Sequence, residues 1–335
     1  MNKKILLITT IMLIASLHCY AQERYSKEYR KALRDGASAK VTIEIKDEIN
    51  QPVTNASVQA FFRMTSGPNV GKSIKGTSDN NGQFIAEGVT TDIVFIKIEK
   101  DGYYTTRAQY IAQSDDPGRL IKGRWLPWNP TIPVVLREVR NPIPMYVKRF
   151  EGKFPNGATV GFDCEKGDFV EPRGEGETTD FTVRVTVDGI PYKHTSGTLN
   201  IESPDPDGGF SVLNTHADSD FKSEYASPES GYVTNMTATS SYDATKGVAG
   251  TGLYGGGECL YFKSRIKRDS DGNVISSNYG KICEEFVFSR HDDGMKDVYV
   301  RFLYYFNPTP NDRNLEFDGK NNLFFPQYKT SQYAP

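Results

Sequence analysis

The chain has 335 residues, with 40 lysines and arginines against 42 aspartates and glutamates, a formal net charge of -2 and 37% hydrophobic residues. This composition is typical of a globular protein, and the length suits two domains. The small net charge argues against a nucleic-acid-binding protein that depends on phosphate neutralisation. The 19 tyrosines, 19 phenylalanines, 30 glycines and 18 prolines favour aromatic-rich strands joined by tight turns.

Residues 1–21 have the pattern of a secretory signal peptide. Lys3 and Lys4 precede an apolar run over residues 5–17, which is too short to span a bilayer, and Cys19-Tyr20-Ala21 resembles a cleavage site. We expect cleavage after Ala21 and a secreted or periplasmic chain without an integral membrane segment. An uncleaved anchor and a lipoprotein modified at Cys19 are the alternatives.

The mature chain would keep Cys164, Cys259 and Cys283, an odd number that suggests one disulfide and one free thiol. Residues 259–283 read as a hairpin closed at residues 269–273, where the paired residue numbers sum to 542. The numbers 259 and 283 also sum to 542, so their Cβ atoms would lie about 4.5–5.5 Å apart across the hairpin. We therefore predict a Cys259–Cys283 disulfide.

The N-terminal part of the mature chain predicts a small β domain over residues 40–139. Residues 22–39 are polar and indicate a linker or a short helix. The alternation of Val41, Ile43 and Ile45 with polar residues then predicts a half-buried strand, and residues 79–82 are expected to close a hairpin.

The segments that carry a family resemblance are Gln51-Pro52-Val53, Asn55-Ala56-Ser57-Val58, Asp79-Asn80-Asn81-Gly82-Gln83-Phe84 and Gly102-Tyr103. Together they resemble the carboxypeptidase regulatory-like, or transthyretin-like, domain. The resemblance implies a Greek-key β-sandwich that serves as a non-catalytic spacer, docking or stabilising module. Residues 113–133 form a longer late segment than is usual in that family. The sequence has no His-x-x-Glu zinc pair of a catalytic carboxypeptidase.

Two segments of this domain suggest ligand sites. Residues 67–73 resemble a phosphate-binding loop, but only three residues separate their glycines and a strand pattern follows, so we expect no nucleotide binding. Trp125 and Trp128 stand in a proline-rich loop that could stack on a sugar or contact a partner. We favour the alternative that the loop folds back and buries the indoles.

Residues 140–150 include Asn141-Pro142-Ile143-Pro144 and indicate a stiff connector. Alternating patterns such as Phe181, Val183, Val185 and Val187 then predict a second, larger β-sandwich or jelly-roll-like domain over residues 151–335. A long loop over residues 204–257 is expected to interrupt it. The predicted fold class is therefore all-β.

Catalytic and metal-binding patterns are sparse. The mature chain would keep His194, His216 and His291. His216 and His291 have aspartates nearby and could contribute to a metal site, but we expect them to be solvated and predict neither a metal nor a cofactor. The sequence has no Gly-x-Ser-x-Gly motif, and residues 269–273 lack the glutamate of a calcium loop. A catalytic pair of carboxylates for glycoside hydrolysis stays an open alternative, because the distance between two carboxylates in the fold is not visible in a sequence.

One basic and aromatic patch is predicted on the hairpin. Tyr261, Lys263, Arg265 and Lys267 alternate on one strand, opposite Tyr279 and Lys281. This face could bind an acidic glycan; the alternative, which we favour, is a solvated sheet face with weak cross-strand contacts.

The leading functional hypothesis is an exported, non-enzymatic protein with a binding, adhesion or structural role at the bacterial cell envelope. Its partner would be a glycan or an envelope protein. The alternatives are a carbohydrate-active enzyme of the glycoside hydrolase type, with its site in the C-terminal domain, and a subunit of a surface assembly.

Overall fold

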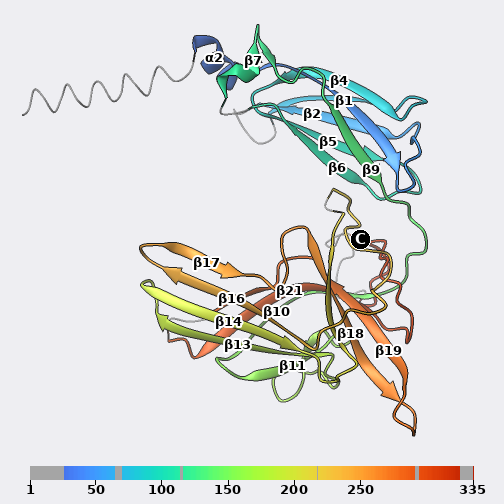
Figure 1. The fold of residues 1–335 in the computed structure, drawn as a ribbon, viewed down its shortest axis with the longest axis vertical. Helices are drawn as coiled ribbons and strands as arrows, with labels where there is room; N and C mark the ends of the chain where they lie inside the picture. Colours follow the sequence, from blue (N-terminus) through green and yellow to red (C-terminus); the bar gives the residue numbers. More distant parts are fainter. Residues whose placement is uncertain (1–25, 65–69, 114–115, 217, 291–293, 325–334) are drawn as a thin grey trace, which may run out of the picture. The chain divides into compact units, whose positions relative to one another are not determined.

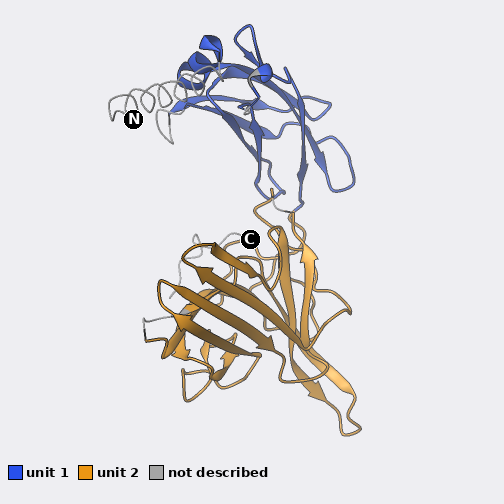
Figure 2. Cartoon of the chain, turned by 60° about the vertical axis from the view of Figure 1, so that its left-hand side comes forward, with its two compact units in different colours: residues 1–138 blue, residues 139–335 orange. Residues whose placement is uncertain are grey.

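The computed structural model describes residues 26–64, 70–113, 116–216, 218–290, 294–324 and 335. The chain divides into two compact units, residues 1–138 and residues 139–335 (Figure 2). The signal sequence over residues 1–21, part of the phosphate-loop-like segment and His291 lie outside the described residues. Among those that are described, no helix is long and apolar enough to cross a membrane.

The first helix described in unit 1 is α2 (Lys27–Asp35), at the place where the sequence indicated a linker or a short helix. The Ser26 Oγ accepts a hydrogen bond from the Tyr29 amide (3.1 Å), which is an N-cap interaction. The helix buries Tyr29 and Ala32, and the chain leaves it at Gly36 with a positive φ of 82°.

Two sheets form the rest of unit 1 (Figure 1). The first has the strand order β4-β1-β8-β7, with β9 also paired to β1, and the second has the order β3-β2-β5-β6. The strands of the first are β1 (Ala37–Asp47), β4 (Gln83–Thr90), β7 (Leu120–Ile121), β8 (Arg124–Trp125) and β9 (Thr131–Leu136), and η1 (Pro117–Arg119) precedes β7. Those of the second are β2 (Ser57–Arg63), β3 (Gly71–Thr77), β5 (Ile93–Glu99) and β6 (Thr106–Ile111).

The core of unit 1 contains the apolar residues that alternate with polar ones along β1. Val41, Ile43 and Ile45 are fully buried, and they belong to one hydrophobic cluster with Phe62 and Ile98 of the other sheet. A strand whose alternate residues are apolar buries one face in this way, because successive side chains point to opposite faces.

The prediction that residues 79–82 close a hairpin is wrong. The local turn forms, with Asp79 Oδ1 accepting hydrogen bonds from the amides of Asn81 (2.9 Å) and Gln83 (2.8 Å). It joins β3 to β4, however, and these strands pair with β2 and β1 in different sheets. A turn motif determines local chain reversal, whereas strand partners are chosen by the faces that must be buried.

Unit 2 contains two larger sheets. One has the order β12-β11-β13-β14-β16-β17, and the other has the order β10-β21-β19-β18-β15, with β20 also paired to β21. The first consists of β11 (Thr159–Asp163), β12 (Asp168–Phe169), β13 (Phe181–Ile190), β14 (His194–Glu202), β16 (Asn235–Asp243) and β17 (Gly247–Thr251). The second consists of β10 (Tyr146–Pro155), β15 (Gly209–Asn214), β18 (Glu258–Arg268), β19 (Val274–Ile282), β20 (Val287–Arg290) and β21 (Asp297–Asn307).

An aromatic core lies between these sheets. The Phe162 ring lies 4.7 Å from that of Phe150, 5.0 Å from that of Phe302 and 5.4 Å from that of Phe181, measured between centroids. The contacts with Phe150 and Phe302 are edge-to-face, which is a favourable arrangement for aromatic rings. The chain is therefore all-β apart from α2 and η1 in the parts described.

Two predicted boundaries in unit 2 need correction. The proposed connector over residues 140–150 is strand from Tyr146 onward, because β10 pairs with β21 along its whole length. The proposed loop over residues 204–257 contains β15, β16 and β17. β16 and β17 consist largely of small and hydroxyl residues, which carry no apolar alternation, so the sequence pattern did not predict them as strands.

The hairpin of β18 and β19 has the register that the residue numbers predict. Leu260 faces Ile282 and Phe262 faces Gly280, and a disulfide joins Cys259 to Cys283. Beyond Ser264 the register shifts, because Arg265 and Ile266 lie opposite Ser277 in a β-bulge.

Candidate functional site

The predicted basic and aromatic patch is not a solvent-facing surface. Tyr261 and Lys281 are 0% and 1% exposed, and Tyr279 is also buried. Tyr261 and Tyr279 belong to a hydrophobic cluster with Leu315 and Phe317, which come from the segment after β21. Both the glycan-binding interpretation and the solvated-face interpretation of this strand face are therefore wrong for these residues.

The buried polar groups on this face are satisfied internally. The Tyr261 hydroxyl accepts a hydrogen bond from the Glu224 amide (2.7 Å). The Lys281 Nζ donates to Ser223 Oγ (2.8 Å) and lies 4.6 Å from the Phe221 and Tyr305 ring centroids. Of the predicted lysines, Lys263 is half-buried and Lys267 is exposed.

Trp125 and Trp128 do not form a shared stacking platform. Trp125 is fully buried, its Nε1 donates to the Thr90 carbonyl (2.8 Å), and its ring packs edge-on against Tyr29. Trp128 is half-buried, with the Arg124 guanidinium 4.8 Å from its ring centroid. The loop therefore buries Trp125, as we expected when we favoured burial over a stacking platform.

The histidines that the structure describes are not gathered into a metal site. His216 Nε2 lies 3.2 Å from Glu224 Oε1, and His194 is exposed at the start of β14. Within the described parts of the chain, no group of three or more His, Cys, Asp or Glu side chains is placed to hold a metal ion.

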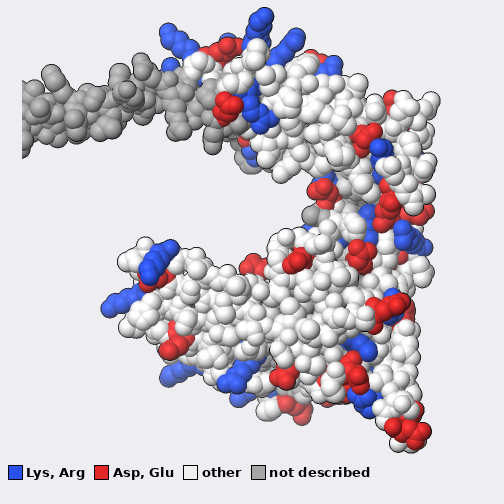
Figure 3. All heavy atoms as spheres, in the orientation of Figure 1, with Lys and Arg blue, Asp and Glu red and all other residues white. Residues whose placement is uncertain are grey.

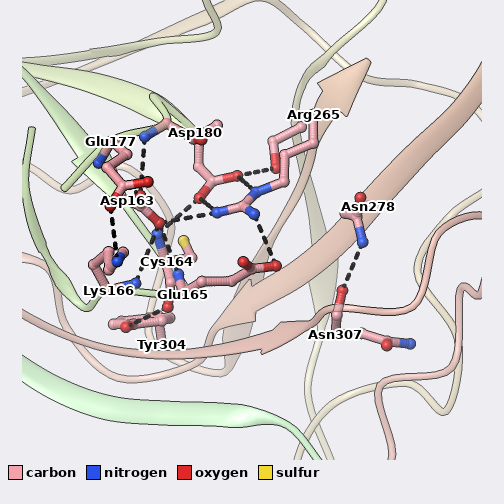
Figure 4. A network of polar contacts seen from close by, with 12 residues as sticks. Asp163, Cys164, Glu165, Lys166, Glu177, Asp180, Arg265, Asn278, Tyr304 and Asn307 are labelled. Carbon is pink, nitrogen blue, oxygen red and sulfur yellow. Dashed lines mark hydrogen bonds and ion pairs between the residues drawn. The ribbon is translucent and has the colours of Figure 1, made fainter. Parts of the chain in front are cut away.

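Arg265 belongs instead to a buried ionic cluster (Figure 4). Its Nη2 lies 2.9 Å from Asp163 Oδ1, its Nε 2.9 Å from Asp180 Oδ1, and its Nη1 2.7 Å from Glu165 Oε1. Asp163 ends β11 and Asp180 directly precedes β13, so the guanidinium of β18 joins the two sheets. Arg265 has a positive φ of 52° in the bulge, which turns its side chain away from the Tyr261 face.

Each aspartate of this cluster is saturated with donors. Asp163 Oδ2 accepts hydrogen bonds from the amides of Glu177 (3.0 Å) and Thr178 (2.9 Å). Asp180 accepts from the Cys164 amide (2.7 Å), besides Arg265 and the hydroxyl of Ser264. Carboxylates that are buried and fully hydrogen-bonded have no lone pair directed at a substrate, so the pair does not resemble a glycosidase acid and base.

The protonation of Asp163 fits this structural role. Burial by itself raises the pKa of Asp163, but the amides of Thr178, Glu177 and Lys166 and the Arg265 charge hold it below its usual range. A catalytic acid needs the opposite shift. Burial, reinforced by Asp180, raises the pKa of the Cys164 thiol well above its usual value, so this third cysteine is protonated and unreactive.

The edge strand β17 is a more accessible site than the buried Arg265 cluster (Figure 1). In the described parts of the chain β17 pairs only with β16, and it ends the six-stranded sheet. All five of its residues, Gly247–Thr251, are exposed, and none is charged or a proline. Natural sheet edges are usually protected by charges, prolines or bulges against pairing with other chains.

A groove of about 280 Å³ lies beside this edge. Val248 and Gly250 of β17, Ser240 of β16, and Phe286 and Phe288 near β20 contribute to its wall. A second hollow of about 130 Å³ also contacts Ser240 and Phe288 and continues toward Gly197 of β14. The space between the two sheets is therefore open along the β17 edge.

Most side chains that line the groove are apolar or carry hydroxyl groups, and Glu285 adds one carboxylate. Val248 is 78% exposed, and its cross-strand neighbour Tyr242 is 38% exposed. Tyr254 also lines the groove, and its hydroxyl donates to the Glu284 carbonyl. Over the visible face of unit 2, basic and acidic side chains are interspersed and form no field of one sign (Figure 3).

No family model and no curated protein matches this chain. Among solved structures, the 3-chlorocatechol 1,2-dioxygenase of Rhodococcus opacus is 13% identical, with a TM-score of 0.25, over 31% of this chain and 61% of its own. A shaft pilin of Lactobacillus rhamnosus is 10% identical, with a TM-score of 0.23, over 72% of this chain and 92% of its own. The major pilin subunit of Bacillus cereus is 10% identical, with a TM-score of 0.22, over 83% of this chain and 85% of its own. The chain spans about 60% of the length of the dioxygenases.

Proposed function

We propose that the protein is a non-enzymatic structural or adhesive component, exported to the bacterial cell envelope, that assembles through β17. In this proposal, β17 of one copy pairs antiparallel with β17 of a second copy, and the two six-stranded sheets join edge to edge. Unit 1 would be a transthyretin-like docking or spacer module. The observation that carries the proposal is the uncharged, fully exposed edge strand beside an open groove.

The sequence of β17 is compatible with pairing to itself. A two-fold axis through Ala249 places Val248 of each copy opposite Gly250 of the other, so a large side chain meets a small one. No like charges meet along the strand, because all five residues are neutral. A two-fold interface of this kind is isologous and closes at the dimer.

A charge-swap experiment tests this pairing. Ala249→Lys and Ala249→Glu each place two like charges directly opposite each other at the axis. We expect the unmodified mature chain to dimerise and each variant alone to dissociate at least about tenfold more readily, since opposed like charges destabilise strand pairs. An equimolar mixture of the two variants should recover the dimer. Sedimentation equilibrium on residues 22–335 measures all three.

Thr186→Lys is the matched control, because Thr186 is exposed in the middle of the same sheet and away from β17. This variant should dimerise like the unmodified chain. A mature chain that is monomeric at all concentrations, or an association that the two Ala249 variants leave unchanged, would contradict the proposal.

A further inference from the structure

The outward face of the β3-β2-β5-β6 sheet in unit 1 carries cations and aromatic rings in adjacent rows. The strand register places Lys75, Gln59, Lys97 and Arg107 side by side across the four strands. The next row contains Ser73, Phe61, Phe95 and Gln109. We call these two rows the cationic–aromatic face.

The face is hollowed where the two rows meet. A depression of about 390 Å³ is lined by Phe61, Phe95, Gln59, Lys97 and Arg107. Phe95 is 39% exposed, which is unusual for a phenylalanine in a sheet that already buries its other face. Exposed rings beside charged groups offer a ligand both stacking and ionic contacts.

The charge on this face is predominantly positive. Lys75, Lys97 and Arg107 are the cations of these two rows, and at their margin Glu99 Oε1 lies 2.7 Å from Lys97 Nζ. Arg63, which pairs with Asp92, also has its guanidinium 5.4 Å from the Phe95 ring centroid. At a strand spacing of about 4.8 Å, the row from Lys75 to Arg107 extends about 14 Å. A small anion cannot span this row, whereas an extended polyanion can contact all three cations.

We propose that the cationic–aromatic face binds an anionic polysaccharide. Its carboxylate or sulfate groups would contact Lys75, Lys97 and Arg107, and its sugar rings would stack on Phe61 and Phe95. The site is independent of β17, which belongs to the other unit. It supplies the basic and aromatic character that the sequence pointed to on the hairpin of unit 2, where the residues proved to be buried.

A polysaccharide is favoured over a single-stranded nucleic acid by the amount of charge. Proteins that bind nucleic acid draw most of their affinity from many phosphate contacts and have strongly basic surfaces. This chain has a net charge of -2, and the face has a single row of three cations. That row suits a polymer whose charges are sparse and whose sugar rings also contribute to binding.

Affinity electrophoresis of the full mature chain tests the proposal with polygalacturonate, dextran sulfate, neutral dextran and an oligothymidylate. We expect retention by at least one acidic polysaccharide, weakened when NaCl rises from about 50 mM to about 500 mM, and none by neutral dextran. Retention by polygalacturonate alone assigns carboxylate recognition, and retention by dextran sulfate alone assigns sulfate recognition. Tighter binding of the oligothymidylate, or no retention by either acidic polymer, would overturn the proposal.

Paired variants locate the site. Lys97→Gln with Arg107→Gln should weaken retention about tenfold, because each exposed ionic contact contributes modestly. The control, Lys40→Gln with Lys46→Gln, removes the same charge from the other sheet of unit 1, where these lysines pair with Glu87 and Glu44.

Phe95→Ala should weaken retention about threefold or more through lost stacking, whereas Ile85→Ala, an exposed apolar position on β4, should not. Equal losses in a variant and its control would place the binding elsewhere.

Discussion

Arg265→Met is expected to lower the free energy of unfolding by about 3–5 kcal/mol, the largest loss that we predict for a single side chain of unit 2. The substitution keeps much of the side-chain volume but leaves Asp163 and Asp180, which are 3% and 0% exposed, without their shared cation. Two uncompensated carboxylates between packed sheets are costly, because the interior solvates charge poorly. Urea denaturation monitored by circular dichroism measures the change. Tryptophan fluorescence serves as a separate readout of unit 1, because Trp125 and Trp128 both lie there.

Arg268→Met serves as the control for this variant. Arg268 also contacts two aspartates, Asp205 and Asp207, at 2.7 Å each, but its side chain is 32% exposed. Because solvent screens that contact, the expected loss is about 1 kcal/mol or less. A loss for Arg265→Met no larger than that for Arg268→Met would show that the buried cluster does not stabilise the fold.

The same cluster predicts how stability depends on pH. The pKa of Asp163 lies below its usual value in the folded chain, so the unfolded state binds more protons as the solution is acidified. The contribution of Asp163 is therefore complete above the unfolded pKa of about 4 and is lost as the pH falls through the folded pKa. Denaturation series between pH 7 and about pH 3 should show this decline. In Arg265→Met a favourable charge is missing, so the folded pKa of Asp163 should rise toward its unfolded value and the decline due to Asp163 should be smaller.

Removal of the disulfide, by Cys259→Ala together with Cys283→Ala, is expected to cost about 3 kcal/mol of stability. The bond closes a loop with a sequence separation of 24 and therefore restricts the unfolded chain. Cys259 is also buried in the hydrophobic cluster that contains Tyr261 and Leu315, so the packing of that cluster should loosen. Thermal and urea unfolding with and without reductant measure the effect.

Reductant provides the internal control for the disulfide. Dithiothreitol should lower the stability of the unmodified chain to nearly that of the double variant and leave the double variant unchanged. If the two proteins unfold alike without reductant, the covalent link contributes nothing to stability. Cys164 does not complicate this comparison, because it is buried and unpaired by disulfide in the structure.

Features that depend on local periodicity could be predicted from the amino-acid sequence. Alternation along residues 41–45 and 181–187 identified strands and their buried sides, because side chains alternate between faces with a period of two. The partner of Cys259 followed from counting outward from one turn. The count held because the two register shifts between that turn and Ser264 add one residue to β19 and one to β18, so that they cancel.

Solvent exposure of the strand faces and the pairing of the strands could not be predicted in this way. The face with Tyr261 and Lys281 has the alternation of a solvated strand, yet segments distant in sequence cover it. A bulge reverses the direction of Arg265, and Asp163 and Asp180 reach it from strands about 100 and 85 residues away. The cationic–aromatic face and the β17 edge likewise arise from the arrangement of several strands. Burial and strand pairing are set by contacts between distant segments, so local pattern cannot specify them.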